Sequence, residues 1–195
     1  MGIDFDNPGT AVKPPSKLAH VVLRTNNMKA MVDFYCTFLG ARIVHGGKML
    51  AFLTYDDEHH RIAFVQIPKT KPKVRGSCGL EHIAFTFDSL SELLLAYRQR
   101  KQNGIMPIWC VNHGTSTSIY YKDPDGNEIE TQIDNFKDPN DATKYMESPE
   151  FEENPIGVDF DPEDMIKRLQ NGEREEVLLQ REKIGRRFLR TNAKL

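Results

Sequence analysis

The sequence lacks long apolar runs and has no large excess of either charge. No stretch approaches the roughly 20 apolar residues that cross a bilayer. The first residues, MGIDFDNPGTAVKPPSK, lack the apolar segment of a secretion signal. The 26 basic and 28 acidic residues give a formal net charge of -2, so no strongly positive surface favours nucleic acid. We therefore expect a cytoplasmic protein that binds neither membranes nor nucleic acids.

Cysteine is scarce as well. The three cysteines, Cys36, Cys78 and Cys110, are odd in number and lack CxxC spacing, which argues against a disulfide framework and against a zinc site made of thiolates. We expect three reduced thiols. The chain has 195 residues, of which 39% are hydrophobic and 28% charged, and this composition is typical of one compact domain with or without a tail.

Two segments that begin 62 residues apart share one layout. The stretches LAHVVLRTNNMKAMVDFYCTFL (18–39) and LEHIAFTFDSLSELLLAYRQRK (80–101) each run from Leu-x-His through an apolar, strand-like piece into apolar residues at helical spacing. Three apolar segments separated by turn residues follow each of them. These segments are 41–46, 49–55 and 61–68, then 106–112, 117–123 and 127–134. The pattern predicts an α+β fold with two βαβββ modules, residues 17–70 and 79–135.

One such module cannot cover its own apolar face, so we expect the two to pair around a shared cleft and form a single domain over residues 17–135. Residues 1–16 are then an N-terminal extension, and residues 136–195 are a C-terminal tail with helices. One tail helix is predicted from Asp161 as N-cap to Gly172, and EREEVLLQREKIGRRFL (173–189) predicts a second. We assign the tail no chemistry.

Strand alternation turns two histidines and a carboxylate towards the predicted cleft. His82 points away from the bulky Ile83, His20 has the same position in the first module, and Glu128 and Glu130 share one face of the last strand. A lone histidine at the start of a strand is usually a hydrogen-bonded core or rim residue, but the same position in two repeats is more specific. Two neutral imidazoles and one carboxylate leave about three open positions on a metal, which is the ligand set of non-heme Fe(II) oxygenases.

The stretch VNHGTSTSIYYKDPDGNEIE (111–130) resembles the signature of the type I extradiol catechol dioxygenases, in the vicinal oxygen chelate superfamily. The matching positions are His113, Ile119, Tyr120, Asp123, Pro124, Gly126 and Glu130. The segment DEHHRIAF (57–64) is similar to the one that carries the family's acid–base histidine, which indicates His60 and not His59. The resemblance covers roughly residues 17 to 135 and is to the one-domain subgroup, such as short 2,3-dihydroxybiphenyl 1,2-dioxygenases.

The resemblance implies a vicinal oxygen chelate (glyoxalase/extradiol dioxygenase) fold and extradiol cleavage. The ring of a catechol-type aromatic would open next to its two hydroxyls, and both atoms of O2 would enter the product. His60 would act as the base that takes a substrate proton, and His113 and Tyr120 would hydrogen-bond the substrate oxygens. The implied ligands of Fe(II), or of Mn(II), which accepts the same set, are His20, His82 and Glu130.

The same fold hosts other chemistry, so two alternatives stay open. A glyoxalase or epimerase uses a divalent metal to stabilise an enolate, and it needs a fourth ligand from the end of the first module. No Asp or Glu lies within residues 60–79, but Gln66 is available there. A metal-free binding module, similar to the bleomycin-resistance proteins, needs no such ligands. Neither alternative explains the combination of His60, His113 and Tyr120.

Three large side chains, Trp109, Phe52 and Met106, are candidates to line the cleft beside an apolar substrate, although such residues are as often ordinary core. His45 and His59 have no role in any of these readings, and we expect them on the surface. Larger members of the family carry a second pair of modules, whereas this chain has one. We therefore expect a homo-oligomer whose assembly, through the C-terminal tail, shields the cleft.

Overall fold

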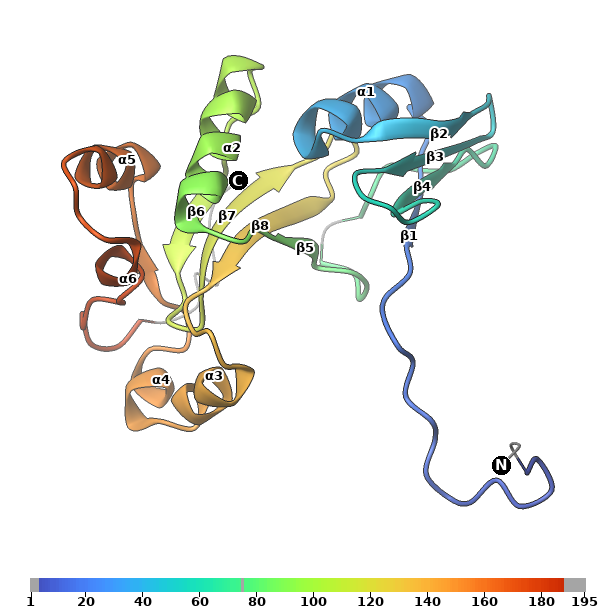
Figure 1. The fold of residues 1–195 in the computed structure, drawn as a ribbon. Coiled ribbons are helices and arrows are strands. Elements are labelled where there is room, and N and C mark those ends of the chain that lie inside the picture. The colour runs from blue at the N-terminus through green and yellow to red at the C-terminus, as the bar shows by residue number, and fades with distance from the viewer. Residues whose placement is uncertain (1–3, 75, 188–195) are drawn as a thin grey trace.

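The computed structural model describes residues 4–74 and 76–187. Its element order confirms the predicted α+β fold with two βαβββ modules (Figure 1). The first module contains β1 (Val21–Arg24), α1 (Met28–Leu39), β2 (Arg42–Gly46), β3 (Leu50–Thr54) and β4 (Ile62–Val65). The second contains β5 (His82–Thr86), α2 (Leu90–Gln102), β6 (Trp109–Asn112), β7 (Ser116–Lys122) and β8 (Glu128–Asp134). Domain limits at residues 16 and 135 stay a prediction.

Each module has its own sheet with the same strand arrangement. The strand orders are β1-β4-β3-β2 and β5-β8-β7-β6, and the second sheet is extended by β9 (Val158–Asp159) from the tail. In both modules the first strand is parallel to the last, and the other contacts between module strands are antiparallel. A parallel pair cannot be joined by a tight turn, so the helix of each module crosses over between its strands.

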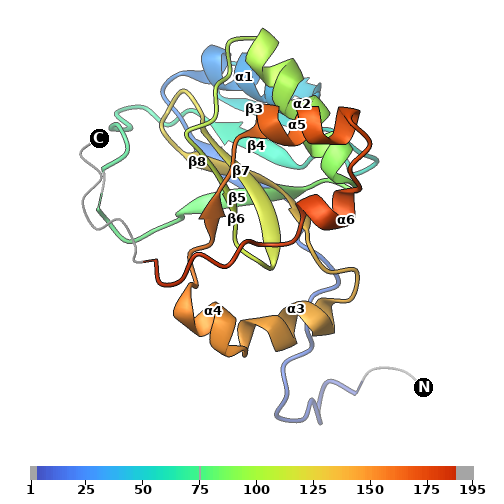
Figure 2. The ribbon, with the colours of Figure 1, turned by 90° about the vertical axis from the view of Figure 1, so that its left-hand side faces the viewer.

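The two helices cover the same side of the two sheets. Helix α1 buries Met31, Tyr35 and Phe38, which are spaced as one helical stripe. Helix α2 begins at the N-cap Ser89, whose hydroxyl accepts a hydrogen bond from the Glu92 amide, and it also turns an apolar stripe inward. Figures 1 and 2 show α1 and α2 above the sheets from two directions. The opposite faces of the sheets therefore remain for the predicted site.

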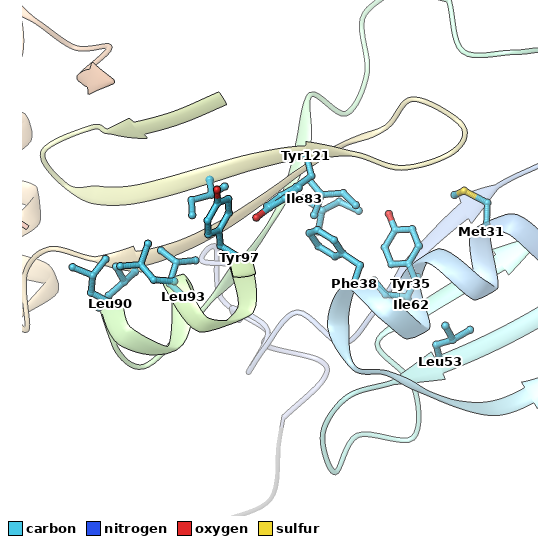
Figure 3. Packing of buried hydrophobic residues seen from close by; sticks show 14 of the residues in the cluster. Met31, Tyr35, Phe38, Leu53, Ile62, Ile83, Leu90, Leu93, Tyr97 and Tyr121 are labelled. Carbon is cyan, nitrogen blue, oxygen red and sulfur yellow. The ribbon is translucent and has the colours of Figure 1, made fainter. Parts of the chain in front are cut away.

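A buried contact between the modules fixes how they are joined (Figure 3). Arg100 of α2 donates from Nε to the carbonyl oxygen of Phe38 at 2.9 Å, and its guanidinium lies 4.1 Å from the centre of the Phe38 ring. The same ring packs edge-on against Tyr121, with centroids 5.0 Å apart. Tyr35 donates from its hydroxyl to Asp123 Oδ2 at 3.2 Å. One continuous core thus spans both modules.

The first predicted helix of the tail is present. Helix α5 (Pro162–Gln170) has Asp161 as N-cap, with its carboxylate accepting from the Glu163 amide, and Gly172 follows the helix with a φ of +88°. Glu163 also binds Lys101 and Arg98 of α2 at 2.8 Å each. Helix α5 is therefore attached to the domain on the helix side.

The second predicted helix of the tail is wrong for most of its length. Only α6 (Glu175–Leu178) is helical, residues 179–187 are not, and residues 188 and 189 lie outside the described part of the chain. Long-range contacts explain the difference, because Arg181 donates to the carbonyl oxygens of His113 and Asn154, and Arg187 donates to that of Gly157. These tertiary bonds outweigh a weak local helical preference.

Two further tail helices were not assigned from the sequence. They are α3 (Pro139–Met146) and α4 (Pro149–Glu153), and Figure 2 shows them on the side of the sheets opposite α1 and α2. Asp138 and Ser148 cap them, each followed directly by proline. The same pattern, a capping residue followed by proline, was used to predict α5. The sequence therefore also contains a signal for the starts of α3 and α4.

We predict that Phe38→Ala lowers the free energy of unfolding by about 3 to 5 kcal/mol, because it empties the contact shared by the two modules. Urea denaturation followed by circular dichroism measures this loss. The matched control is Phe5→Ala, since Phe5 is 83% exposed and its truncation should change stability by less than about 0.5 kcal/mol. Equal effects of the two substitutions would contradict the assignment of Phe38 to the junction.

Candidate active site

The parallel pairing of β5 and β8 brings His82 and Glu130, the two candidate ligands of the second module, together. Ala84 lies opposite Glu130 and His82 opposite Glu128, so the side chains of His82 and Glu130 extend from the same face of neighbouring strands. His82 Nε2 is 3.0 Å from Glu130 Oε2, and Glu130 is 5% exposed. Glu128 instead lies 3.3 Å from Lys122 Nζ. This pairing supports the prediction that Glu130, and not Glu128, serves the site.

Tyr120 and His113 extend this cluster. Tyr120 on β7 lies opposite Glu130, and its hydroxyl is 3.0 Å from His113 Nε2. Burial, then the charge of Glu130, raises the pKa of Tyr120, so the phenol stays protonated and can donate. Trp109 on β6 stacks on the Tyr120 ring with centroids 5.1 Å apart. We call His82, His113, Tyr120 and Glu130 the second-module group.

The tail holds His113 in one orientation. His113 Nδ1 is 2.6 Å from the carbonyl oxygen of Ile156, which can only accept a hydrogen bond. Nδ1 must therefore carry the proton, and in the neutral ring Nε2 accepts from the Tyr120 hydroxyl. Burial lowers the pKa of His113 and favours this neutral ring. The tail thus contributes directly to the candidate site, which the sequence analysis did not anticipate.

A tight turn positions the Ile156 carbonyl. Asn154 Oδ1 accepts from the amides of Ile156 and Gly157, at 3.2 and 2.8 Å, and Gly157 has a φ of +106°. A Cβ atom at Gly157 would lie 2.8 Å from His113 Cα, closer than side chains normally approach. The sequence NPIG does signal a turn, but nothing in it names His113 as the partner.

The other candidate residues form a separate cluster on the first module. His20 directly precedes β1, His60 lies in the turn before β4, and their ring centroids are 4.3 Å apart. Phe52 on β3 stacks on His60 at 4.9 Å. Desolvation, with smaller contributions from His20 and His59, lowers the pKa of His60, so this ring favours its neutral form. We call His20, Phe52 and His60 the first-module group.

The two groups are not joined within one chain. Across residues 4–74 and 76–187, no set of three or more His, Cys, Asp or Glu side chains is placed to hold a metal ion. The structure brings His82 to Glu130 but does not bring His20 to them. The donor chemistry of the three side chains suits Fe(II) or Mn(II). In the described part of one chain, His20 therefore lies apart from His82 and Glu130.

Of the residues predicted to line the cleft, two lie beside the groups. Phe52 contacts His60 and Trp109 contacts Tyr120, whereas Met106 is an exposed residue before β6. His45 and His59 are on the surface as expected, with His59 Nδ1 2.9 Å from Glu58 Oε1. Aromatic rings therefore flank both groups.

Comparison with known proteins gives the family. A model of the Glyoxalase/Bleomycin resistance protein/Dioxygenase superfamily matches residues 17–131. The chain belongs to this superfamily. It is 50% identical over 147 residues to Biphenyl-2,3-diol 1,2-dioxygenase 2 of Rhodococcus globerulus. The matched region covers 75% of this chain and 77% of the relative. Biphenyl-2,3-diol 1,2-dioxygenase 3 of the same organism is 44% identical over 148 residues, covering 75% and 78%.

These similarities confirm the predicted family and, within it, an extradiol ring-cleaving dioxygenase. A lactoylglutathione lyase of Neisseria meningitidis is less similar, with 28% identity over 58% of this chain and 88% of the relative. Among solved structures, a glyoxalase/dioxygenase from Nostoc punctiforme matches with a TM-score of 0.54 and 21% identity, over 65% of this chain and 98% of that one. This last likeness shows the fold alone.

We predict that Gly157→Ala releases the His113 ring, because the added methyl group displaces the turn that holds the Ile156 carbonyl. Imidazole nitrogen NMR should show the Nδ1-protonated ring in the unchanged protein and a mixture of tautomers in the variant. Gly172→Ala is the matched control, since Gly172 also has a positive φ but has no atom within 4 Å of an added Cβ. An unchanged His113 spectrum in Gly157→Ala would mean that the tail does not orient this ring.

Proposed function

We propose that the chain is an Fe(II)-dependent dioxygenase that opens the ring of a substituted catechol, of the biphenyl-2,3-diol type, next to its two hydroxyls. Both atoms of O2 would enter the product. The observation that carries this proposal is the second-module group, in which a buried carboxylate, an imidazole and a phenol share one sheet face, and a second imidazole just after β6 lies 3.0 Å from the phenol hydroxyl. The similarity to the two Rhodococcus globerulus enzymes supports the substrate class.

His20, His82 and Glu130 are the proposed metal ligands. Two neutral imidazoles and one carboxylate suit Fe(II), and Mn(II) accepts the same set. When bound, the metal would supply a site where both catechol oxygens and O2 bind and would favour loss of a substrate proton.

His60 is the proposed proton acceptor. Because its pKa is lowered, the ring is neutral near pH 7 and can take a proton from a substrate hydroxyl at a ring nitrogen. Its stacking on Phe52 holds the ring in place. The proton returned by His60 would then be available for a product oxygen. A neutral base positioned before the substrate arrives needs no reorganisation to act.

His113 and Tyr120 are proposed to orient the substrate. His113 Nε2 is an acceptor because Nδ1 is bound to Ile156, and the Tyr120 hydroxyl is a protonated donor. Once a catechol displaces the hydrogen bond between them, Nε2 can accept from a protonated catechol oxygen and the Tyr120 hydroxyl can donate to a deprotonated one. Trp109 and Phe52 provide apolar surface for the ring and its substituent.

We also propose that the protein is cytoplasmic and forms a homo-oligomer.

The glyoxalase or epimerase alternative has weaker support. Gln66, its candidate fourth ligand, lies just after β4, and its backbone N–H donates to the Met49 carbonyl oxygen. This places the residue at the end of the first module, as that alternative requires. The alternative still leaves the hydrogen-bonded pair of His113 and Tyr120 without a task.

We predict that anaerobically purified, Fe(II)-loaded protein consumes one O2 per catechol or biphenyl-2,3-diol and forms a yellow product. His60→Ala should keep its metal and lower kcat by about 10²- to 10⁴-fold, the usual effect of removing a general base. An oxygen electrode measures O2 consumption, and the visible spectrum measures formation of the yellow product. His45→Ala is the histidine control and should react at the unchanged rate. Loss of metal from His60→Ala would reassign that residue as a ligand.

A second prediction concerns the two glutamates of β8. Glu130→Gln should lower the Fe(II) content at least about tenfold, because it removes a charged ligand. Glu128→Gln is the matched control and should retain its metal, since Glu128 pairs with Lys122. Metal analysis after gel filtration measures both. If Glu128→Gln loses the metal and Glu130→Gln keeps it, the proposed ligand is wrong.

A further inference from the structure

The indole of Trp109 lies where the tail meets the second-module group. Its ring stacks on the Tyr120 ring, with centroids 5.1 Å apart and planes 24° apart. The same indole meets the His113 ring edge-on, with centroids 5.6 Å apart. Both side chains that are proposed to orient the substrate therefore pack against one aromatic ring. The position of this ring limits the positions that the phenol and the imidazole can take.

A carboxylate from the tail binds this indole. Trp109 donates from Nε1 to Asp159 Oδ1 at 2.7 Å. Strand β9 pairs with β6 so that Asp159 lies opposite Val111, and its side chain extends from the sheet face that carries Trp109 and Tyr120. An indole N–H can only donate, and a hydrogen bond to an ionised carboxylate is strong and directional. The bond to Asp159 therefore restrains how the indole can turn about its side-chain bonds.

Arg187, further along the tail, holds the carboxylate in turn. Its Nη2 lies 2.7 and 2.9 Å from the two carboxylate oxygens of Asp159, and its Nη1 donates to the Gly157 carbonyl oxygen at 3.0 Å. The guanidinium carbon is 5.9 Å from the centre of the indole ring, within the range of a cation–π contact. An isolated ion pair on a surface contributes little. This pair is tied to the backbone and to an aromatic ring as well, so its geometry is defined.

We propose that the ion pair of Asp159 and Arg187 positions Trp109 and, through it, the two side chains that orient the substrate. Asp159 and Arg187 are thus positioning residues for ring cleavage. This inference rests on the roles proposed above for Tyr120 and His113. Without the ion pair the indole is free to turn, and the phenol and the imidazole lose the ring against which they pack. Small displacements of groups that orient a substrate slow turnover without removing any catalytic group.

The chain has a single tryptophan, so the position of this indole can be observed directly. In protein labelled with 5-fluorotryptophan, the one fluorine NMR signal reports on Trp109. We expect Arg187→Gln and Asp159→Ala each to shift and broaden this signal. Arg168→Gln is the matched control and should leave it unchanged, since Arg168 is another arginine of the tail whose carboxylate partner is Glu173, at 2.7 and 2.6 Å. An unchanged signal in Arg187→Gln would overturn the proposal.

Turnover measures the consequence for the reaction. We expect Arg187→Gln to lower kcat for biphenyl-2,3-diol about tenfold, the effect of a misplaced orienting group. Its Fe(II) content and its midpoint of urea denaturation should equal those of Arg168→Gln. Arg187→Lys keeps the charge beside Asp159 and should recover part of the lost kcat. A fall in kcat that comes with a matching loss of Fe(II) or a lower urea midpoint would overturn the proposal, because Arg187 would then only stabilise the fold.

A double-mutant cycle shows whether Arg187 acts through the indole. Trp109→Phe keeps an aromatic ring next to Tyr120 but removes the N–H that binds Asp159. We expect Arg187→Gln to lower kcat in the unchanged protein but to change it by less than about twofold in Trp109→Phe, since residues that act as one unit are not additive. The same loss in both backgrounds would mean that Arg187 acts through the Gly157 carbonyl oxygen alone, which would overturn the proposal.

The fluorine signal separates this inference from the proposed reaction. If the unchanged protein cleaves no catechol, the dioxygenase proposal fails, and the signal of Arg187→Gln still decides whether the ion pair holds the indole. If the unchanged protein cleaves biphenyl-2,3-diol and Arg187→Gln has the same kcat, the reaction is supported and the positioning role is rejected.

Discussion

The parallel pairing of the first and last strand of each module is the constraint on which the rest of the structure depends. A parallel pair needs a long connection between its strands, and in each module this connection includes a helix, α1 or α2, that covers one face of the sheet. The other face is left for polar side chains. The pairing also joins the beginning of a module to its end, which is how His82 and Glu130 become neighbours on β5 and β8.

Burial then favours the neutral forms of two members of the second-module group, Tyr120 and His113. The pKa of Tyr120 is raised and that of His113 is lowered, so both side chains are neutral in the same pH range. Their hydrogen bonds consequently run in one direction, from the Tyr120 hydroxyl to His113 Nε2 and from Nδ1 to the Ile156 carbonyl oxygen. A fixed direction of this kind preorganises donors and acceptors for a substrate with two hydroxyl groups.

Much of this arrangement could be predicted from the sequence, because strands and helices have their own periodicities and the repeat shows where each module begins. Strand alternation placed His82 and Glu130 on one face, and the resemblance selected Glu130. Alternation indicates the face on which a side chain lies, but not whether two faces from different sheets meet, so the separation of His20 could not be predicted. The role of Ile156 was also hidden, since a backbone carbonyl can come from any residue type.

The hydrogen bond between His113 and the Ile156 carbonyl oxygen forms at a defined stage of biosynthesis, because Ile156 lies in the tail. Domains generally fold from the amino terminus during synthesis. A nascent chain that has released residues 17–135 already contains His20, His82 and Glu130. Its His113 ring is held only after the turn at residues 154–157 has emerged and docked. The orientation of the His113 ring is therefore set late in biosynthesis, by a segment that supplies a single carbonyl oxygen to it.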